Sequence, residues 1–122
     1  MSKRDPKVRL LHMREFARKA VGLTQGKSQT DLENDEVLRL AVTHLVELVG
    51  EAASQLPAES RDQYPEIAWA KIVNMRNRLI HGYDYVDHKI LWDTLTTNLP
   101  ELLAQLERVL GPWQPMPPRD RQ

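Results

Sequence analysis

The segment 75–83, Met-Arg-Asn-Arg-Leu-Ile-His-Gly-Tyr, places three side chains suited to phosphate chemistry close together in the sequence. Arg76 carries a guanidinium that can neutralise charge on phosphate oxygens. His81 carries an imidazole, the side chain best able to take up and release protons near neutral pH. The phenol of Tyr83 follows two residues later. These residue types indicate phosphodiester chemistry as the first functional hypothesis.

The elements that must position this segment are helices. Apolar residues recur at helical spacing in four stretches, and Pro and Gly residues separate them. We expect a first helix capped by Asp5 and opened by Pro6, and a third helix that ends at Gly82. The predicted helices cover about 6–22, 30–56, 66–82 and 84–110. Leucines keep one register on both sides of Pro100, so the fourth helix is predicted to be kinked rather than divided.

Composition favours a single helical domain. The chain has 122 residues, 41% of them hydrophobic and 28% charged, with five glycines and one phenylalanine. We therefore predict an all-α fold, an antiparallel bundle of four main helices, over residues 1–110. Four prolines after residue 110 predict a flexible tail over 111–122.

Arg76 falls near the middle of the apolar face predicted for the third helix, among Trp69, Ile72, Val73, Met75 and Leu79. An unpaired guanidinium is costly to bury, so a carboxylate must meet it or this face must border a polar cleft. Glu47 and Glu51 of the second helix are candidate partners. Two readings stay open here: a buried Arg-Glu clamp that holds the bundle together, and a catalytic arginine.

His81 lies about 140° from Arg76 on an ideal helix, so the two side chains do not share a face without help from a loosened helix end or a second subunit. Asn77 stacks one turn before His81 and could orient its imidazole. The alternative is that His81 is only a C-terminal cap residue favoured by the helix dipole. Tyr83 can likewise be a packing tyrosine with a solvated hydroxyl.

Other catalytic classes lack their motifs. The chain has no cysteine, no glycine-rich phosphate loop and no serine nucleophile elbow. His12, His44 and His88 lack the spacing of metal ligands, so we predict no metal. No apolar run is long enough for a signal peptide or a membrane span, and we predict a cytoplasmic protein with no membrane partner.

The formal net charge is zero, whereas non-specific nucleic-acid binders usually carry a basic excess. Any contact with RNA must therefore come from local clusters. Arg78 and Arg14 are the candidate RNA contacts. Arg14 belongs to an N-terminal basic cluster, although such a cluster is more often a solvated helix face. The cluster consists of Lys3, Arg4, Lys7, Arg9, Arg14, Arg18 and Lys19.

The chain resembles the HepT-like toxins of the HEPN superfamily, also called the DUF86 family. Arg76, four intervening residues, His81, one residue and Tyr83 match the arginine-histidine-tyrosine signature of that family. Four neighbouring stretches also look like the family: Val49-Gly50-Glu51-Ala52-Ala53, Pro65-Glu66-Ile67 with Trp69, Leu91-Trp92, and Leu99-Pro100-Glu101-Leu102-Leu103. The similarity runs from about residue 4 to residue 110.

The resemblance implies a dimeric HEPN-like bundle and a metal-independent endoribonuclease that needs no cofactor. In such an enzyme Arg76 and His81 are catalytic at a dimer cleft, Asn77 and Glu51 support them, and cleavage of RNA leaves a 2′,3′-cyclic phosphate. The family also implies a toxin-antitoxin pair, in which a small nucleotidyltransferase antitoxin transfers AMP to Tyr83. The alternative is a non-catalytic HEPN-like module that binds nucleotide, RNA or a nucleotidyltransferase partner.

Overall fold

The chain forms helices throughout the part that the computed structural model describes, residues 5–79 and 86–115. The helices are α1 (Pro6–Leu23), α2 (Gln29–Asn34), α3 (Glu36–Ser54), α4 (Ala58–Asp62), α5 (Trp69–Leu79), α6 (His88–Asp93), the π-helix η1 (Thr94–Asn98) and α7 (Leu99–Leu110). No strand element is found within those two ranges. The predicted all-α class is confirmed.

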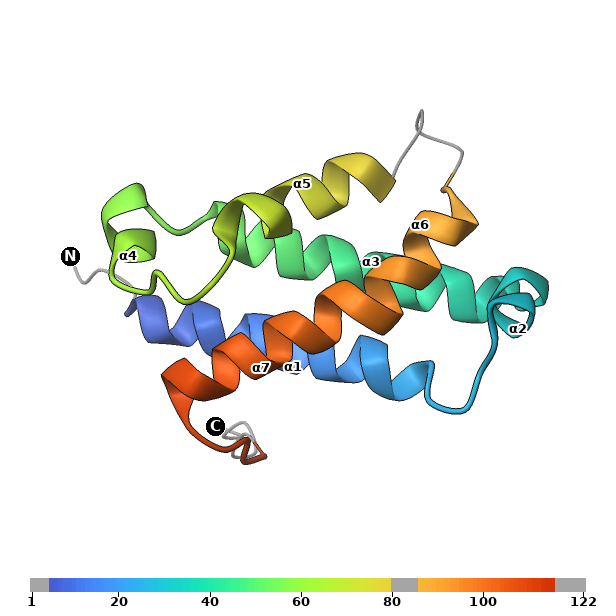
Figure 1. The fold of residues 1–122 in the computed structure, drawn as a ribbon, viewed down its shortest axis with the longest axis horizontal. Helices are drawn as coiled ribbons and strands as arrows, with labels where there is room; N and C mark the ends of the chain where they lie inside the picture. The colour runs from blue at the N-terminus through green and yellow to red at the C-terminus, as the bar shows by residue number, and fades with distance from the viewer. Residues whose placement is uncertain (1–4, 80–85, 116–122) are drawn as a thin grey trace, which may run out of the picture.

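Four long helical segments run antiparallel in chain order: α1, α3, α5 and the continuous α6–η1–α7 (Figure 1). The helix α1 packs against both α3 and α7, and α5 packs against α3. The short helices α2 and α4 lie at opposite ends of the bundle (Figure 1). Short connections between antiparallel neighbours are the usual arrangement of a helix bundle. None of the described helices is both long and apolar enough to cross a membrane.

One apolar core joins all four segments. Each helix contributes residues spaced three or four positions apart, which is the spacing that keeps side chains on one face. The fully buried large side chains are Leu10, Met13, Leu32, Val42, Val46, Val49, Leu79, Leu91, Leu95, Leu99 and Leu106. This core fixes the direction of α5, the helix that carries the candidate catalytic segment.

The predicted second helix is in fact two helices. Ser28 and Asp31 form a reciprocal capping box that starts α2, and the Asp35 carboxylate accepts from the Leu38 amide at 3.0 Å to start α3. Residues 30–34, which the sequence offers as possible caps of one long helix, thus lie inside a separate short helix. The register of α3 also differs in part from the apolar stripe that the sequence predicts, which consists of Val37, Leu38, Ala41, Leu45, Leu48, Val49 and Ala52. Val37 is exposed, whereas Val42 and Val46, outside that stripe, are buried.

The fourth segment passes Pro100 through a π-turn. The amide of Leu99 donates to the carbonyl of Thr94, five residues earlier, and α7 then begins with proline in its first turn. The hydroxyls of Thr94 and Thr96 each donate to the carbonyl four residues earlier, at 2.8 Å. Such back-bonding bends helices, and proline lacks the amide that a regular helix would use. One continuous but distorted helix results, as predicted.

The first residues after α7 pack against α1, and the flexibility predicted for residues 111–122 stays a prediction. Arg14 donates to the carbonyl of Gly111 at 2.9 Å, and Trp113 donates to Glu15 at 3.4 Å. Gly111 has a φ of 86°, a conformation that glycine adopts without strain. Residues 116–122 lie outside the described residues.

Candidate functional site

The helix α5 positions the arginine of the signature. Ile72, Met75 and Leu79 are buried and hold one face of α5 against the core. Arg76 lies one turn after Ile72, next to that buried row, as the helical wheel predicts. Its side chain lies outside the described residues, as do the whole of His81 and Tyr83. Their roles stay predictions.

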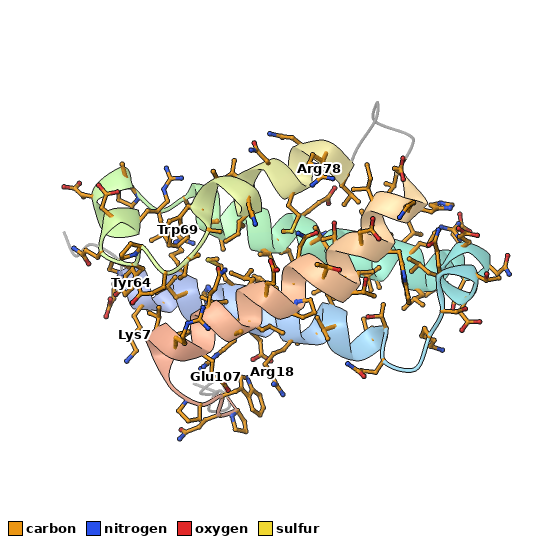
Figure 2. The ribbon with its side chains drawn as sticks, viewed as in Figure 1. Lys7, Arg18, Tyr64, Trp69, Arg78 and Glu107 are labelled. Atoms are coloured by element: carbon orange, nitrogen blue, oxygen red, sulfur yellow. The ribbon has the colours of Figure 1, made fainter. Side chains whose placement is uncertain are left out.

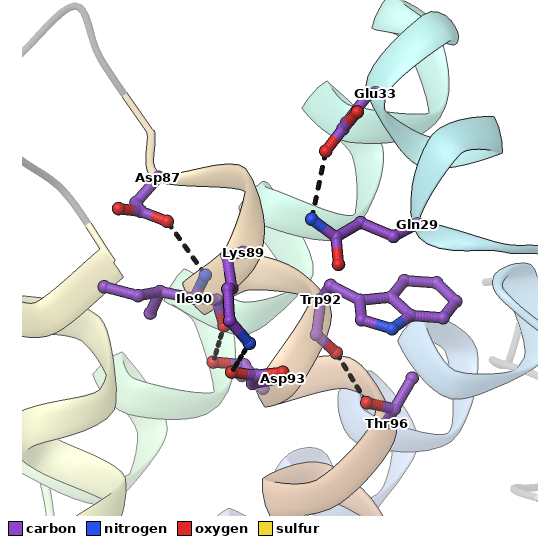
Figure 3. Close-up of polar contacts among 9 residues, drawn as sticks. Gln29, Glu33, Asp87, Lys89, Ile90, Trp92, Asp93 and Thr96 are labelled. Atoms are coloured by element: carbon purple, nitrogen blue, oxygen red, sulfur yellow. Dashed lines mark hydrogen bonds and ion pairs between the residues drawn. The ribbon is translucent and has the colours of Figure 1, made fainter.

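The described residues on either side of His81 and Tyr83 in the sequence are bonded to each other. The amide of Asp87 donates to the carbonyl of Leu79 at 3.2 Å, which ties the end of α5 to the start of α6. The Asp87 carboxylate also caps α6 by accepting from the Ile90 amide at 3.0 Å (Figure 3). A backbone bond thus joins the end of α5 to Asp87, and the side chain of Asp87 caps α6.

A surface ion pair stabilises the same part of α6. The Nζ atom of Lys89 lies 3.1 Å from Oδ2 of Asp93, and both side chains are well exposed (Figure 3). An exposed pair at this helical spacing contributes only a few tenths of a kcal/mol. It supports α6 without bearing on chemistry.

The candidate supporting residues occupy two surfaces. Asn77 is exposed on α5, where it is available to a ligand or to a neighbouring side chain. Glu51 is exposed on α3 and accepts from the Gln55 amide group at 3.1 Å. Because α5 packs on α3, an interaction between Arg76 and Glu51 stays a prediction that this packing allows.

Glu51 belongs to an outward face of α3 with an open hollow of about 440 Å³, lined by His44, Glu47, Leu48 and Glu51. The Nδ1 atom of His44 lies 4.0 Å from Oε1 of Glu47. Two exposed apolar residues, Val37 and Leu40, continue the same face toward the start of α3. This outward face of α3 is thus apolar at one end and acidic at the other.

The candidate RNA contacts have different environments. Arg78 is exposed and lies at the carboxyl end of α5 (Figure 2). Arg14 is only 7% exposed, and its guanidinium is bonded to Gly111. The burial and the bond to Gly111 make Arg14 a less accessible group than Arg78, and its contact with RNA stays a prediction. The sequence could not show that Gly111 packs against α1.

Sequence reasoning missed a second basic surface. Lys71, Asn74, Met75, Arg78 and Asn98 line a hollow of about 340 Å³ between α5 and the π-turn. The signal was present on α5, where Lys71, Asn74 and Arg78 fall at helical spacing. Asn98 comes from another helix, and no pattern in the sequence places it beside them. Among the described residues, no group of three or more His, Cys, Asp or Glu residues could hold a metal ion.

The sequence comparisons identify the family. The family described as Ribonuclease HepT-like matches residues 13–109, which are most of the chain. This chain belongs to the HepT-like ribonuclease family. The match includes α3, α5 and the segment between α5 and α6, so the residues of the signature lie inside the family's homologous region.

Several relatives of the HepT-like chain share nearly its whole length. "Putative RNase TTE0752" of Caldanaerobacter subterraneus subsp. tengcongensis is 33% identical over 107 residues, 88% of this chain and 96% of the relative. "Putative RNase MJ1216" of Methanocaldococcus jannaschii is 30% identical over 90% of this chain and 91% of the relative. "Probable ribonuclease HepT" of Thermococcus cleftensis is 35% identical over 62% of this chain and 68% of the relative. No solved structure gives a significant match.

Proposed function

We propose that this HepT-like protein is the toxin of a toxin-antitoxin pair, an endoribonuclease that cleaves RNA without a metal ion. The family match over residues 13–109 carries the proposal, because it includes the whole Arg76, His81 and Tyr83 signature. The relatives named as ribonucleases support RNA as the substrate. The chemistry is assigned to Arg76 and His81, with Asn77 and Glu51 in support.

The proposed reaction is an internal transfer at phosphorus. The RNA 2′-hydroxyl loses its proton, its oxygen bonds to the adjacent phosphorus, and the bond from phosphorus to the 5′-oxygen breaks. His81 acts as general acid or base, on the 2′-hydroxyl or on the leaving 5′-oxygen. Arg76 stabilises the charge that develops on the phosphate oxygens. The products are a 2′,3′-cyclic phosphate and a 5′-hydroxyl, and no cofactor takes part.

The active form is proposed to be a homodimer in which the two signature segments face a shared cleft. The outward face of α3 is its proposed interface, since Val37 is 77% exposed and Leu40 is 65% exposed. Apolar side chains this exposed on one helix face favour a protein contact. A two-fold axis would duplicate this face, so that each copy covers the other's Val37 and Leu40.

The proposed antitoxin is a small nucleotidyltransferase. It would transfer AMP from ATP to Tyr83: the phenol oxygen bonds to the α-phosphorus, pyrophosphate leaves, and the phenol proton passes to a base. A nucleotide attached to Tyr83 would bring negative charge and bulk to a phosphate-binding segment, and both would exclude RNA. Mass spectrometry of the protein expressed with its neighbouring nucleotidyltransferase would detect one added AMP, absent in Tyr83→Phe and retained in Tyr85→Phe.

The test of the nuclease is incubation of purified protein with total tRNA and with messenger RNA in chelator. The wild type is expected to give discrete fragments with cyclic phosphate ends, whereas His81→Ala and Arg76→Ala give none. His12→Ala, a histidine on α1, is the matched control and should cleave normally. No cleavage by the unmodified wild-type dimer would contradict the proposal and favour a non-catalytic module that binds RNA, nucleotide or the nucleotidyltransferase.

Thermal and denaturant unfolding of Arg76→Ala separates catalysis from a structural clamp. A catalytic arginine that is not needed for packing leaves the free energy of unfolding nearly unchanged. Removal of one partner of a buried ion pair instead costs about 3–5 kcal/mol. A loss of that size would make Arg76 a clamp, and the assignment of catalysis would then rest on His81.

A further inference from the structure

The hollow between α5 and the π-turn is lined by residues other than Arg76, His81 and Tyr83 of the signature. Its lining residues are Lys71, Asn74, Met75, Arg78 and Asn98, which include two cations and two amides but no carboxylate. A smaller hollow between α5 and α7 shares Lys71, Met75 and Asn98 but is also lined by Glu101 and Gln105. We call the hollow lined by Lys71, Asn74, Met75, Arg78 and Asn98 the α5–η1 groove.

The two cations of the α5–η1 groove are available to a ligand. Lys71 and Arg78 are both exposed, and neither is paired with a carboxylate among the described residues. They are seven residues apart on α5, so about 10 Å separates them along the helix axis and they project from the same side. For a chain with zero net charge, such an unpaired basic pair is a local source of positive potential.

The π-turn supplies the opposite wall. Asn98 is the last residue of η1, and the wider turn leaves its side chain half-buried beside α5 while Leu95 and Leu99 stay in the core. Its amide, like that of Asn74, can both donate and accept hydrogen bonds. Amides suit the hydroxyls and base edges of a single-stranded nucleic acid, and the two cations suit its phosphates. Interrupted helical turns of this kind often occur at functional sites.

We propose that the α5–η1 groove binds single-stranded RNA beside the cleavage site, with Lys71 and Arg78 on backbone phosphates and Asn74 and Asn98 on sugar or base groups. This inference rests on the proposed ribonuclease function. Arg78 is two residues, or about 200°, beyond Arg76 on α5. The groove thus lies on a different side of α5 from the position of Arg76. The nucleotides that it binds are neighbours of the cleaved bond along the RNA and not the two nucleotides that this bond joins. An acidic protein surface fits the groove less well, because carboxylates only accept hydrogen bonds and leave the amide oxygens of Asn74 and Asn98 without a donor.

The experiment measures binding of a fluorescent single-stranded RNA oligonucleotide to the His81→Ala protein over a series of salt concentrations. Adding Lys71→Gln and Arg78→Gln is expected to weaken binding and to reduce the slope of log K against log salt by about 1.4, because each phosphate contact contributes about 0.7 for a single strand. Lys19→Gln with Lys27→Gln removes the same charge from exposed positions elsewhere and should leave the slope unchanged. An unchanged slope in the groove variant would overturn the proposal.

Two further variants test the amides without a change of shape. Asn74→Asp and Asn98→Asp are isosteric, so both variants are expected to keep the fold, which circular dichroism checks. They are expected to weaken RNA binding because they add negative charge to the groove. In the nuclease with His81 intact, the groove variants should raise KM more than they lower kcat, since they act on binding away from the reacting bond. Equal losses in KM and kcat would contradict a separate binding groove.

The same variants distinguish failure of the groove from failure of the nuclease. Normal cleavage and RNA affinity in the groove variants, with cleavage still lost in His81→Ala, would reject the groove and keep the ribonuclease. RNA binding that depends on Lys71 and Arg78, in a protein that never cleaves RNA, would keep the groove and reject the nuclease. Loss of affinity for poly-glutamate but not for RNA would assign the groove to an acidic protein and overturn the proposal.

Discussion

The guanidinium carbon of Arg18 lies 3.8 Å from the centre of the Trp113 ring, so the chain that follows α7 is packed onto α1. Figure 2 shows Arg18 near the end of α7, beside the strap formed by residues 111–113. The positive charge of Arg18 is attracted to the face of the indole ring. Arg14 and Glu15 of the same helix also form hydrogen bonds with residues of this strap. Two arginines of the N-terminal basic cluster thus anchor the chain's own tail.

Arg14→Ala is expected to lower the free energy of unfolding by about 1.5–3 kcal/mol, because it removes a hydrogen bond from a charged, buried donor to Gly111. Lys19→Ala removes the same charge from an exposed position of α1 and should change stability by less than about 0.5 kcal/mol. Urea unfolding of both variants checks the difference. Equal stability would show that the bond to Gly111 contributes nothing, and a loss of RNA affinity in folded Arg14→Ala would support its role as an RNA contact.

Two glycine substitutions should have opposite signs. Gly111 has φ 86° and ψ −179°, a region that side chains rarely adopt, so Gly111→Ala is expected to cost about 1–3 kcal/mol. Gly22 lies within α1, and an added Cβ there meets no atom within 4 Å. Gly22→Ala should therefore stabilise the protein by about 0.5–1 kcal/mol, since alanine favours the helix. Melting temperatures of the two variants and the wild type check both signs. A higher melting temperature for Gly111→Ala would show that the positive φ at residue 111 does not require glycine.

The helices were predictable from sequence because each signal is local. Pro6 after Asp5 marks the start of α1, and the leucines around Pro100 keep one register through the π-turn. The sequence does not reveal the division at Asp35, because Thr30, Asp31, Asn34 and Asp35 are all residue types that cap helices. Only the bond from the Leu38 amide to the Asp35 carboxylate shows which one starts α3. Register on α3 was missed because Val37 and Val42 are equally apolar, and only packing against α1 decides which is buried.

Candidate residues were predictable only where they share one stretch of chain. Arg76, His81 and Tyr83 are close in sequence, so a motif could identify them without a fold. Asn98 and Lys71 line the same hollow from two different helices, and their proximity depends on how those helices pack. The burial of Arg14 likewise depends on a contact 97 residues away in sequence. Long-range contacts of this kind leave no periodic signal in a single sequence.

Acid should weaken the start of α2. The backbone amide of Ser28, and then its hydroxyl, hydrogen-bond with Asp31 and hold the pKa of that carboxyl below its ordinary value of 3.8. Because the folded-state pKa is depressed, the stabilisation is present above pH 3.8 and is lost as the pH falls through the folded value. The difference in stability between wild type and Asp31→Asn should thus be constant near neutral pH and shrink below about pH 4. Asp62→Asn, at an exposed carboxylate of α4, is the control.

Unfolding curves from pH 7 to pH 3 measure this effect, and hydrogen exchange of the α2 amides measures it locally. The protection factors of the α2 amides, taken relative to the intrinsic exchange rate at each pH, should fall at low pH in the wild type more than in Asp31→Asn, which has no carboxylate to protonate. A wild-type advantage over Asp31→Asn that persisted undiminished at pH 3 would show that the charge of Asp31 does not stabilise the capping box.

Disruption of the outward face of α3 should dissociate the proposed dimer. Val37→Asp with Leu40→Asp removes apolar burial of about 1.5–3 kcal/mol per side chain, and two-fold symmetry repeats each loss in the partner. The dissociation constant should therefore rise by at least roughly a hundredfold, with cleavage activity falling in parallel. Sedimentation velocity over a range of concentrations measures the dissociation constant of the dimer, and the tRNA assay measures the cleavage activity. Leu23→Asp, at an exposed leucine of α1, is the control, and a Val37/Leu40 variant that stays dimeric would place the interface on another face.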